Sequence, residues 1–255
     1  MTKVTTHKDF TTCWLDLGTS DVSGAIDFYG DVLGWTAEPG PPETGGYCRA
    51  QVDGRDVAGI GPQMNESQPV AWTVYIQTPD IAATVKKAES LGATIVFGPH
   101  EVMSFGSMAV FIDPVGAALG LWQPNEMKGT QVVDEPGAWT WSELTTSDMD
   151  GSVAFYSQLF GWSASEYSGA GMDYREMKIG EDSVAGFMPR PEGMPAEVPN
   201  FWGVYFNTES LDKSIEVLTA KGGHLVFGPM EIEPGRFAQF VDAQGAMASL
   251  LEFKH

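Results

Sequence analysis

The feature that most constrains this chain of 255 residues is an internal repeat. Residues 14–35 read WLDLGTSDVSGAIDFYGDVLGW and residues 141–162 read WSELTTSDMDGSVAFYSQLFGW, with ten of the 22 positions identical. Composition alone would give about one or two identities. Further matches continue along both copies, at offsets of 126 to 130 residues: Arg49/Arg175, Trp72/Trp202, Gly98/Gly228 and Gly116/Gly245. The repeat predicts two domains of one fold in tandem.

The expected domains span residues 10–124 and 137–253, and residues 125–136 are the expected linker. This linker sequence is polar and has turn-forming residues at both ends, Pro124-Asn125 and Pro136-Gly137. Such a composition is typical of a connection between domains.

Within each copy a smaller unit occurs twice. In the first, a short strand at residues 14–17 precedes a helix with Asp21 at its start and Gly34 at its end, residue types that favour helix caps. Strand-like segments follow at residues 47–52 and 57–60, separated by an Asp53-Gly54 turn. The second unit repeats the order, with segments at residues 72–77, 81–91, 94–97, 108–112 and 118–122. The sequence therefore predicts an α+β protein made of four βαβββ modules.

Composition excludes several classes of function. A formal net charge of −20 argues against binding to the phosphate backbone of nucleic acids. No run reaches the roughly 18 apolar residues that a membrane-spanning helix needs, and residues 1–9 do not resemble a signal peptide. Cys13 and Cys48 lack the spacing of a zinc site or of a disulfide framework. We expect a cytoplasmic protein, either monomeric or homodimeric, whose partner is a small molecule.

Several motifs carry a resemblance to a known family. A Ser-Asp turn, a helix containing Phe28-Tyr29 and a terminal Gly34-Trp35 resemble the opening of glyoxalase/bleomycin-resistance proteins, the vicinal oxygen chelate superfamily. Asp113-Pro114-Val115-Gly116 matches the Asp-Pro-x-Gly of that superfamily, and Asp242-Ala243-Gln244-Gly245 is a diverged copy. The resemblance covers nearly the whole chain. It implies that each pair of modules curls into a cup whose concave face holds the ligand.

The resemblance also indicates where a metal would be bound in each cup. Metal-dependent relatives place His, Gln or Glu at four inward-facing positions, because divalent ions need oxygen or nitrogen ligands on converging strands. Counting from the turn aspartates places Trp14, Thr73, Gly120 and a residue near Gly59 at these positions in the first domain. The corresponding positions in the second domain are Trp141, Gly203, Ser249 and a residue near Gly186. A shift of one residue is open at Thr73 and at the last pair. We expect no metal and no other cofactor.

Other polar residues remain as candidates. The four histidines, His7, His100, His224 and His255, do not occupy equivalent repeat positions. Asp16 and Glu143 do correspond, and each lies two residues after a tryptophan, on the same face of its strand. A carboxylate beside an indole can bind a cation, act as a general base, or hydrogen-bond to the backbone.

Three interpretations follow. In the first, each cup is a metal-free binding site for a planar or cationic molecule, as in resistance proteins that sequester a ligand. In the second, the chain is a lyase, isomerase or oxygenase-like enzyme in which Asp16 or Glu143 transfers protons, or which binds a metal through unrecognised ligands. In the third, one cup is purely structural. The predicted ligand-binding residues are Trp14, Asp16, Thr73, Trp122, Trp141, Glu143, Gly203 and Ser249, with Asp16 and Glu143 as catalytic candidates.

Overall fold

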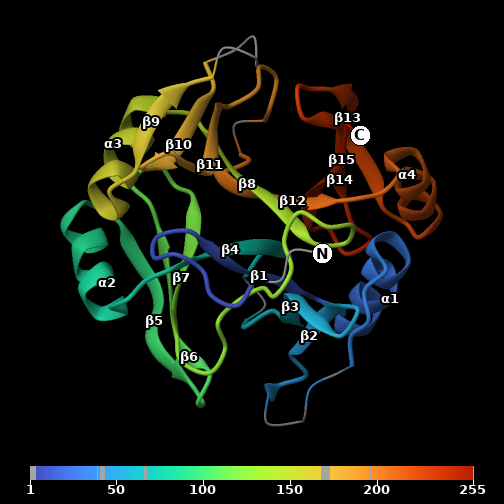
Figure 1. Cartoon of the computed structure of the whole chain (residues 1–255), viewed down its shortest axis with the longest axis horizontal. Coiled ribbons are helices and arrows are strands. Elements are labelled where there is room, and N and C mark those ends of the chain that lie inside the picture. Colours follow the sequence, from blue (N-terminus) through green and yellow to red (C-terminus); the bar gives the residue numbers. More distant parts are fainter. Residues whose placement is uncertain are drawn as a thin grey trace.

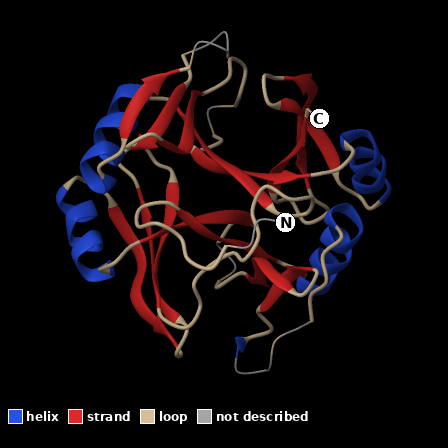
Figure 2. Cartoon of the chain, viewed as in Figure 1, coloured by secondary structure: helices blue, strands red, loops and turns tan. Residues whose placement is uncertain are grey.

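A computed structural model of the chain describes residues 4–38, 40, 44–65, 68–167, 173–195 and 197–254. They form two curled sheets, with a pair of helices at each lateral edge of the molecule (Figures 1 and 2). The elements of the first half are β1 (Thr12–Thr19), α1 (Val22–Leu33), β2 (Cys48–Val52), β3 (Arg55–Pro62), β4 (Ala71–Gln77), α2 (Ile81–Ser90), β5 (Thr94–Val102), β6 (Gly106–Ile112) and β7 (Ala118–Pro124). Those of the second half are β8 (Trp139–Thr146), α3 (Met149–Phe160), β9 (Ser163–Glu166), β10 (Arg175–Ile179), β11 (Asp182–Pro189), β12 (Phe201–Asn207), α4 (Leu211–Ala220), β13 (His224–Glu231), β14 (Gly235–Val241) and β15 (Met247–Phe253).

Each half of the chain forms one sheet. The first has the strand order β2-β3-β1-β4-β7-β6-β5, and the second has the order β13-β14-β15-β12-β8-β11-β10-β9. In both, the first strands of the two modules pair antiparallel at the centre, β1 with β4 and β8 with β12. We call the concave face of the first sheet cup 1 and that of the second cup 2. The two cups open towards opposite sides of the molecule (Figure 1), which confirms the predicted two-cup α+β fold.

Helix ends follow the predicted capping pattern. The Asp21 carboxylate accepts a hydrogen bond from the Gly24 amide at 2.9 Å, and Gly34 ends α1 with a φ of 71°. Asp148 and Gly161 play the same parts in α3. These caps satisfy backbone groups that a helix end leaves free.

Between α1 and β2, the described residues of the first module form an isolated bridge between Thr36 and Gln51, where the third module has strand β9.

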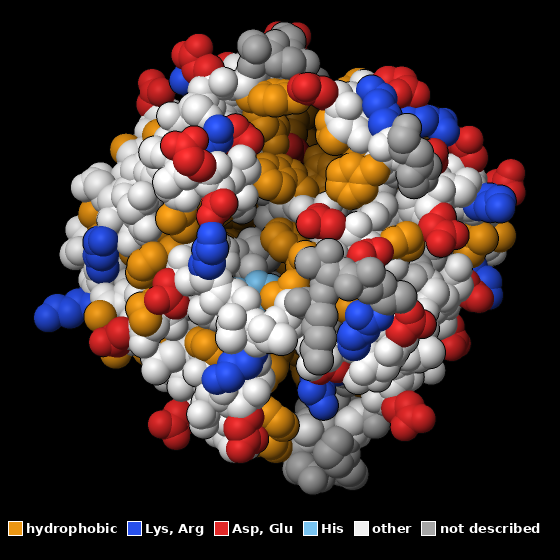
Figure 3. Space-filling view, in the orientation of Figure 1, with side chains coloured by type: hydrophobic (Ala, Val, Ile, Leu, Met, Phe, Trp, Pro, Cys, Tyr) orange, Lys and Arg blue, Asp and Glu red, His pale blue; other side chains and the backbone are white. Residues whose placement is uncertain are grey.

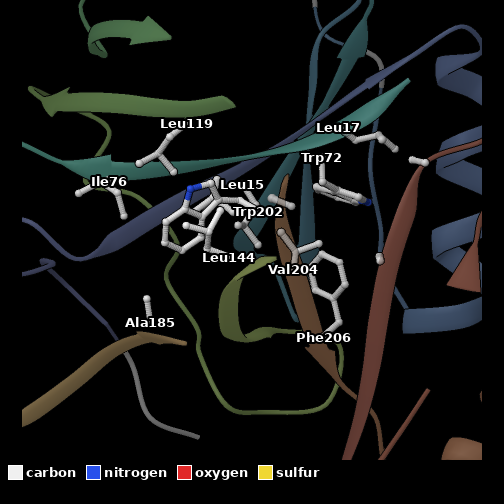
Figure 4. Close-up of a cluster of buried hydrophobic side chains, with 14 of the residues drawn as sticks. Leu15, Leu17, Trp72, Ile76, Leu119, Leu144, Ala185, Trp202, Val204 and Phe206 are labelled. Carbon is white, nitrogen blue, oxygen red and sulfur yellow. The ribbon is translucent and has the colours of Figure 1, made fainter. Parts of the chain in front are cut away.

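The convex faces of the two sheets pack against each other and share one core. Its buried side chains come from both halves, and Trp72 of β4 lies 5.1 Å from Phe206 of β12 between ring centroids. Figure 4 shows Leu15, Trp72, Trp202 and Phe206 converging there. The two halves are thus one packed body.

Two equivalent sets of buried hydrogen bonds lie at this interface, and in each a tyrosine of one half donates to an aspartate of the other half. The Tyr156 hydroxyl donates to Asp113 at 2.8 Å and accepts from the Trp202 indole at 2.9 Å. Equivalent bonds join Tyr29 to Asp242 at 3.0 Å and Trp72 to Tyr29 at 3.0 Å. The family-like motifs of one half are therefore satisfied by the other half.

The two aspartates also organise their own turns. Asp113 accepts amide hydrogens from Val115 and Ala117, and Asp242 accepts them from Gln244, Gly245 and Ala246. Although the Asp242 motif has diverged in sequence, it keeps the same structural role as the Asp113 motif.

Replacing Tyr156 with phenylalanine tests these links. The substitution leaves the buried Asp113 carboxylate and the Trp202 indole each without one partner, so we expect unfolding free energy to fall by about 1–3 kcal/mol. Chemical denaturation measures the loss. The control is Tyr167→Phe, which removes a hydroxyl bonded to the exposed Glu233. Equal stability of the two variants would contradict the structural role of Tyr156.

Candidate functional site

Strand alternation decides which side chains enter the cups. On β8 and β12, Leu144 and Trp202 belong to the shared core, whereas Trp141, Glu143 and Tyr205 lie outside it, on the concave face. The same alternation on β1 and β4 gives cup 1 its Trp14, Asp16 and Tyr75. Each cup therefore has an indole, a carboxyl group and a phenol on its floor.

Asp16 is the centre of a hydrogen-bond cluster in cup 1. Its Oδ1 accepts from the Trp14 indole nitrogen at 2.8 Å and from the Tyr47 hydroxyl at 2.7 Å. Tyr75, which pairs with Trp14 across β1 and β4, also stabilises the ionised Asp16 carboxylate. Burial raises the pKa of Asp16, and these donors oppose the rise by stabilising the ionised form.

Glu143 occupies the corresponding place in cup 2. The Tyr205 hydroxyl donates to its Oε1 at 2.8 Å, and Tyr174 provides a second hydroxyl. The Trp141 indole donates to the Tyr174 hydroxyl at 3.1 Å. Burial raises the pKa of Glu143, while the two tyrosine donors act in the opposite direction. Glu143 is thus a buried carboxyl group with its proton affinity increased.

Glycines on the neighbouring strands make room for these tyrosines. Gly59 is paired with Asp16, and a Cβ atom at Gly59 would overlap the Tyr47 hydroxyl and the Asp16 carboxylate. Gly186 is paired with Glu143, and a Cβ atom there would overlap the Tyr174 hydroxyl. Tyrosine hydroxyls therefore occupy the space beside the positions where the family resemblance would place metal ligands.

The remaining predicted ligand positions carry small side chains. Thr73 and Gly203 pair with Asp16 and Glu143, and the Cβ of an alanine at Gly203 would have its nearest neighbour at 3.6 Å. Gly120 lies against the Tyr75 ring, and the buried Ser249 pairs with Tyr205. These positions place no imidazole or carboxylate in either cup.

The donor set does not fit a metal ion. Within the residues that the structure describes, no group of three or more His, Cys, Asp or Glu side chains is arranged to hold one. The Asp16 and Glu143 carboxylates each already accept a hydrogen bond from a tyrosine hydroxyl. His7 contacts Thr130, His100 and His224 lie on exposed strand positions, and His255 lies outside the described residues.

The two cups differ in how they are filled. In cup 1, Trp14 and Trp122 are 2% and 5% exposed and pack in one apolar cluster, joined by Met127 of the segment between the halves. The Trp122 indole donates to the Met127 carbonyl at 3.0 Å. Trp122 thus fills cup 1 over Trp14, while Asp16 stays half-buried at the side. The N-terminal segment covers the same side, where His7 and Val4 bond to Thr130 and Gln131.

Cup 2 has a different surface. Leu251 stands at the position of Trp122, and Trp141 is half-buried. Figure 3 shows a hollow above the strands of this sheet, lined by apolar side chains and with acidic atoms visible at depth. Glu143 keeps 8% of its surface exposed. Cup 2 therefore offers an apolar cavity with a polar floor.

Sequence reasoning missed the tyrosines that complete both floors. Tyr47 and Tyr174 are separated by 127 residues, the same offset as the best-matched segment, and Tyr75 and Tyr205 belong to the repeated Trp-x-Val-Tyr sequence. The offset signal was present, but Tyr47 and Tyr174 lie in loops just before strands β2 and β10, where strand alternation gives no direction.

No helix within the described ranges is long and apolar enough to cross a membrane.

Two cups built from βαβββ modules, each with a polar floor, define a glyoxalase-type architecture. A model of the glyoxalase-like domain matches residues 13–121, and a model of the glyoxalase/bleomycin resistance protein/dioxygenase superfamily matches residues 126–249. The chain belongs to this superfamily, as a member with two such domains.

Full-length relatives agree with this assignment. The chain is 37% identical to "Putative glyoxylase CFP32" of Mycobacterium tuberculosis, over 99% of this chain and 98% of the relative. It is 32% identical to the anthracycline biosynthesis protein DnrV of Streptomyces peucetius, over 94% and 92%.

Solved structures share the fold at low sequence identity. The Mn(II)-bound glyoxalase from Novosphingobium aromaticivorans superposes with a TM-score of 0.68 at 16% identity, covering 96% of this chain and 82% of that one. The 2,3-dioxygenase LapB from Pseudomonas sp. KL28 gives a TM-score of 0.66 at 14% identity, covering 98% and 94%.

Proposed function

We propose that this protein binds a planar small molecule in cup 2, without a metal ion. The observation that carries the proposal is the difference between the cups: Trp122 and Met127 fill cup 1, whereas cup 2 keeps an apolar hollow above Glu143. Small-molecule sites are typically apolar cavities with a few polar groups that orient the ligand. The equivalent residues on the floor of cup 1 would serve as structural support.

Aromatic side chains favour a planar ligand. Trp141, Tyr174 and Tyr205 surround Glu143, and stacking on such rings contributes about 0.5–1.5 kcal/mol beyond the area buried. The relatives named for anthracycline biosynthesis support the same choice, because anthracyclines contain a planar fused-ring system. A cation would also be attracted to an ionised Glu143 and to the indole face of Trp141.

An enzyme that uses Glu143 as a general acid or base is a second candidate. The supporting observation is the raised pKa of this carboxyl group, which brings it closer to the pH at which proton transfer is effective. Asp16 has a similar shift but lies beside the filled part of cup 1. Turnover lost in Glu143→Gln and kept in Asp16→Asn would favour this candidate over binding alone.

Titration with a dihydroxyanthraquinone tests the binding site. We expect about one molecule bound per chain, unchanged by a chelator, and an affinity about three- to tenfold lower in Trp141→Ala because a stacking surface is lost. Calorimetry or dye absorbance reports the affinity.

The matched control is Trp14→Ala, which removes the equivalent indole from the filled cup. Its affinity is expected to stay within about twofold of the parent once the folded fraction is corrected. Absence of binding, or a requirement for an added divalent ion, would contradict the proposal. A larger loss in Trp14→Ala than in Trp141→Ala would place the ligand in cup 1.

A further inference from the structure

We propose that the ligand of cup 2 is a fused-ring phenol that lies along an aromatic wall and donates its hydroxyl to Glu143. This inference rests on the proposed binding function and names the chemical class of the ligand.

The wall consists of three rings that lead from the floor to the rim. Tyr205 of β12 lies 6.0 Å from Phe237 of β14, and Phe237 lies 5.7 Å from Phe227 of β13, between ring centroids. Tyr205 is buried and bonded to Glu143, Phe237 is half-buried, and Phe227 is 49% exposed. A ligand with several fused rings can contact all three, whereas a single ring can contact only part of this wall.

A second set of aromatic residues stands on the other side of Glu143. Tyr174 receives the Trp141 indole hydrogen and lies 5.8 Å from Tyr167 between ring centroids. The Tyr167 hydroxyl donates to Glu233, in the turn between β13 and β14. The two edges of the sheet, β9 and β13, therefore approach each other at the mouth of cup 2. This geometry produces a slot between aromatic walls, which suits a flat molecule.

The floor selects for a hydrogen-bond donor. An ionised carboxylate only accepts hydrogen bonds, and its two oxygens have room for about four donors. Tyr205 supplies one of them at 2.8 Å, and the Tyr174 hydroxyl lies beside the same carboxyl group and also stabilises its ionised form. A phenolic hydroxyl at the inner end of the ligand provides a further donor, whereas a carbonyl there would face an acceptor.

Cup 1 lacks this arrangement. Met108 stands at the position of Phe237, which interrupts the aromatic wall, and Trp122 fills the space that Leu251 leaves open in cup 2. The wall and the cavity thus occur together in the second cup.

Acid is expected to weaken the bond from the ligand hydroxyl. Burial raises the pKa of Glu143, so the carboxylate gains a proton at a higher pH than a free glutamic acid. The charged and titratable groups around it stay fixed over this acidic range. The pKa values of Tyr174 and Tyr205 are raised, chiefly by burial, so both remain neutral. Bonds from Lys178 and Ser183 lower the pKa of Glu176, so it remains ionised. Affinity for a phenol should fall as the pH decreases through the Glu143 pKa.

The test compares three probes by calorimetry on the full chain: a dihydroxyanthraquinone, anthraquinone without hydroxyl groups, and phenol. We expect the dihydroxyanthraquinone to bind about tenfold more tightly than anthraquinone at neutral pH, with this advantage lost in acid. Glu143→Gln should remove the advantage and its pH dependence while leaving anthraquinone affinity within about twofold. Phe237→Leu should weaken both three-ring probes about three- to tenfold and phenol by less.

The outcomes separate the two proposals. If anthraquinone and dihydroxyanthraquinone bind equally, and Glu143→Gln changes neither, the phenol assignment is wrong while the planar-ligand site stands. Equal losses for phenol and the three-ring probes in Phe237→Leu would overturn the role of the wall. If no planar probe binds the folded parent protein, the proposed function itself fails.

Discussion

Replacing Trp202 with alanine is expected to lower the free energy of unfolding by about 3–5 kcal/mol. Trp202 is 4% exposed and lies in the shared core, with ring contacts to Tyr156, Trp162 and Phe187. Its loss creates a cavity between the two halves and leaves the Tyr156 hydroxyl without the indole donor. Urea denaturation followed by circular dichroism measures the change.

Trp141→Ala is the matched control, because it removes the same side chain from a neighbouring strand of the same sheet. Trp141 lies half-buried on the concave face and outside the shared core, so a loss of about 1–2 kcal/mol is expected. Trp202→Ala should thus lose mainly stability, whereas Trp141→Ala should lose mainly affinity for the planar probe. Similar losses of stability in both would mean that Trp141 also supports the core.

Gly186→Ala is expected to reduce binding of a planar probe in cup 2 at least tenfold. The added methyl group would overlap the Tyr174 hydroxyl, which must then leave its place between Trp141 and Glu143. The overlap should also destabilise the fold by about 1–3 kcal/mol. Titration with a dihydroxyanthraquinone, at a temperature where the variant is fully folded, separates the loss of affinity from the loss of stability.

Gly203→Ala provides the control on the opposite side of the same carboxyl group. Gly203 also pairs with Glu143, but its added methyl group would meet neighbours only at 3.6 and 3.8 Å, an ordinary contact distance. We expect affinity within about threefold of the parent. If both substitutions abolish binding, the loss does not arise from Tyr174, and the cavity above Glu143 is too narrow for any added atom.

The repeat made the fold predictable. Matching segments fixed the order of strands and helices, and the capping residues Asp21 and Gly34 fixed where the first helix begins and ends. The family motifs could also be identified from the sequence, but the contacts that their side chains make could not. Tyr29 and Asp242 are 213 residues apart, and sequence spacing carries no sign that their side chains meet.

The candidate site was predictable only in part. Alternation along a strand placed Asp16 beside Trp14 and Glu143 beside Trp141, and the structure brings both pairs onto concave faces. Strand alternation could not place Tyr174, because this residue precedes a strand. It also could not show that Met127, a residue of the connecting segment, packs in cup 1. Trp122 was predicted to bind a ligand, and nothing in the sequence indicated that its indole donates to the Met127 carbonyl. Such contacts depend on the path of a loop back to the sheet, and the periodicity of the sequence does not determine that path.

The hydrogen bonds between the two halves constrain which substitutions this duplicated chain can accept. Because Tyr156 of one half completes the turn of Asp113 in the other, and Tyr29 does the same for Asp242, neither half satisfies its buried polar groups alone. Each half therefore needs the other, and the interface between them constrains both copies equally. The concave faces lie outside that constraint. One copy of the duplicated floor could therefore be filled by Trp122 and Met127, while the other kept the apolar hollow in which we propose that the ligand binds.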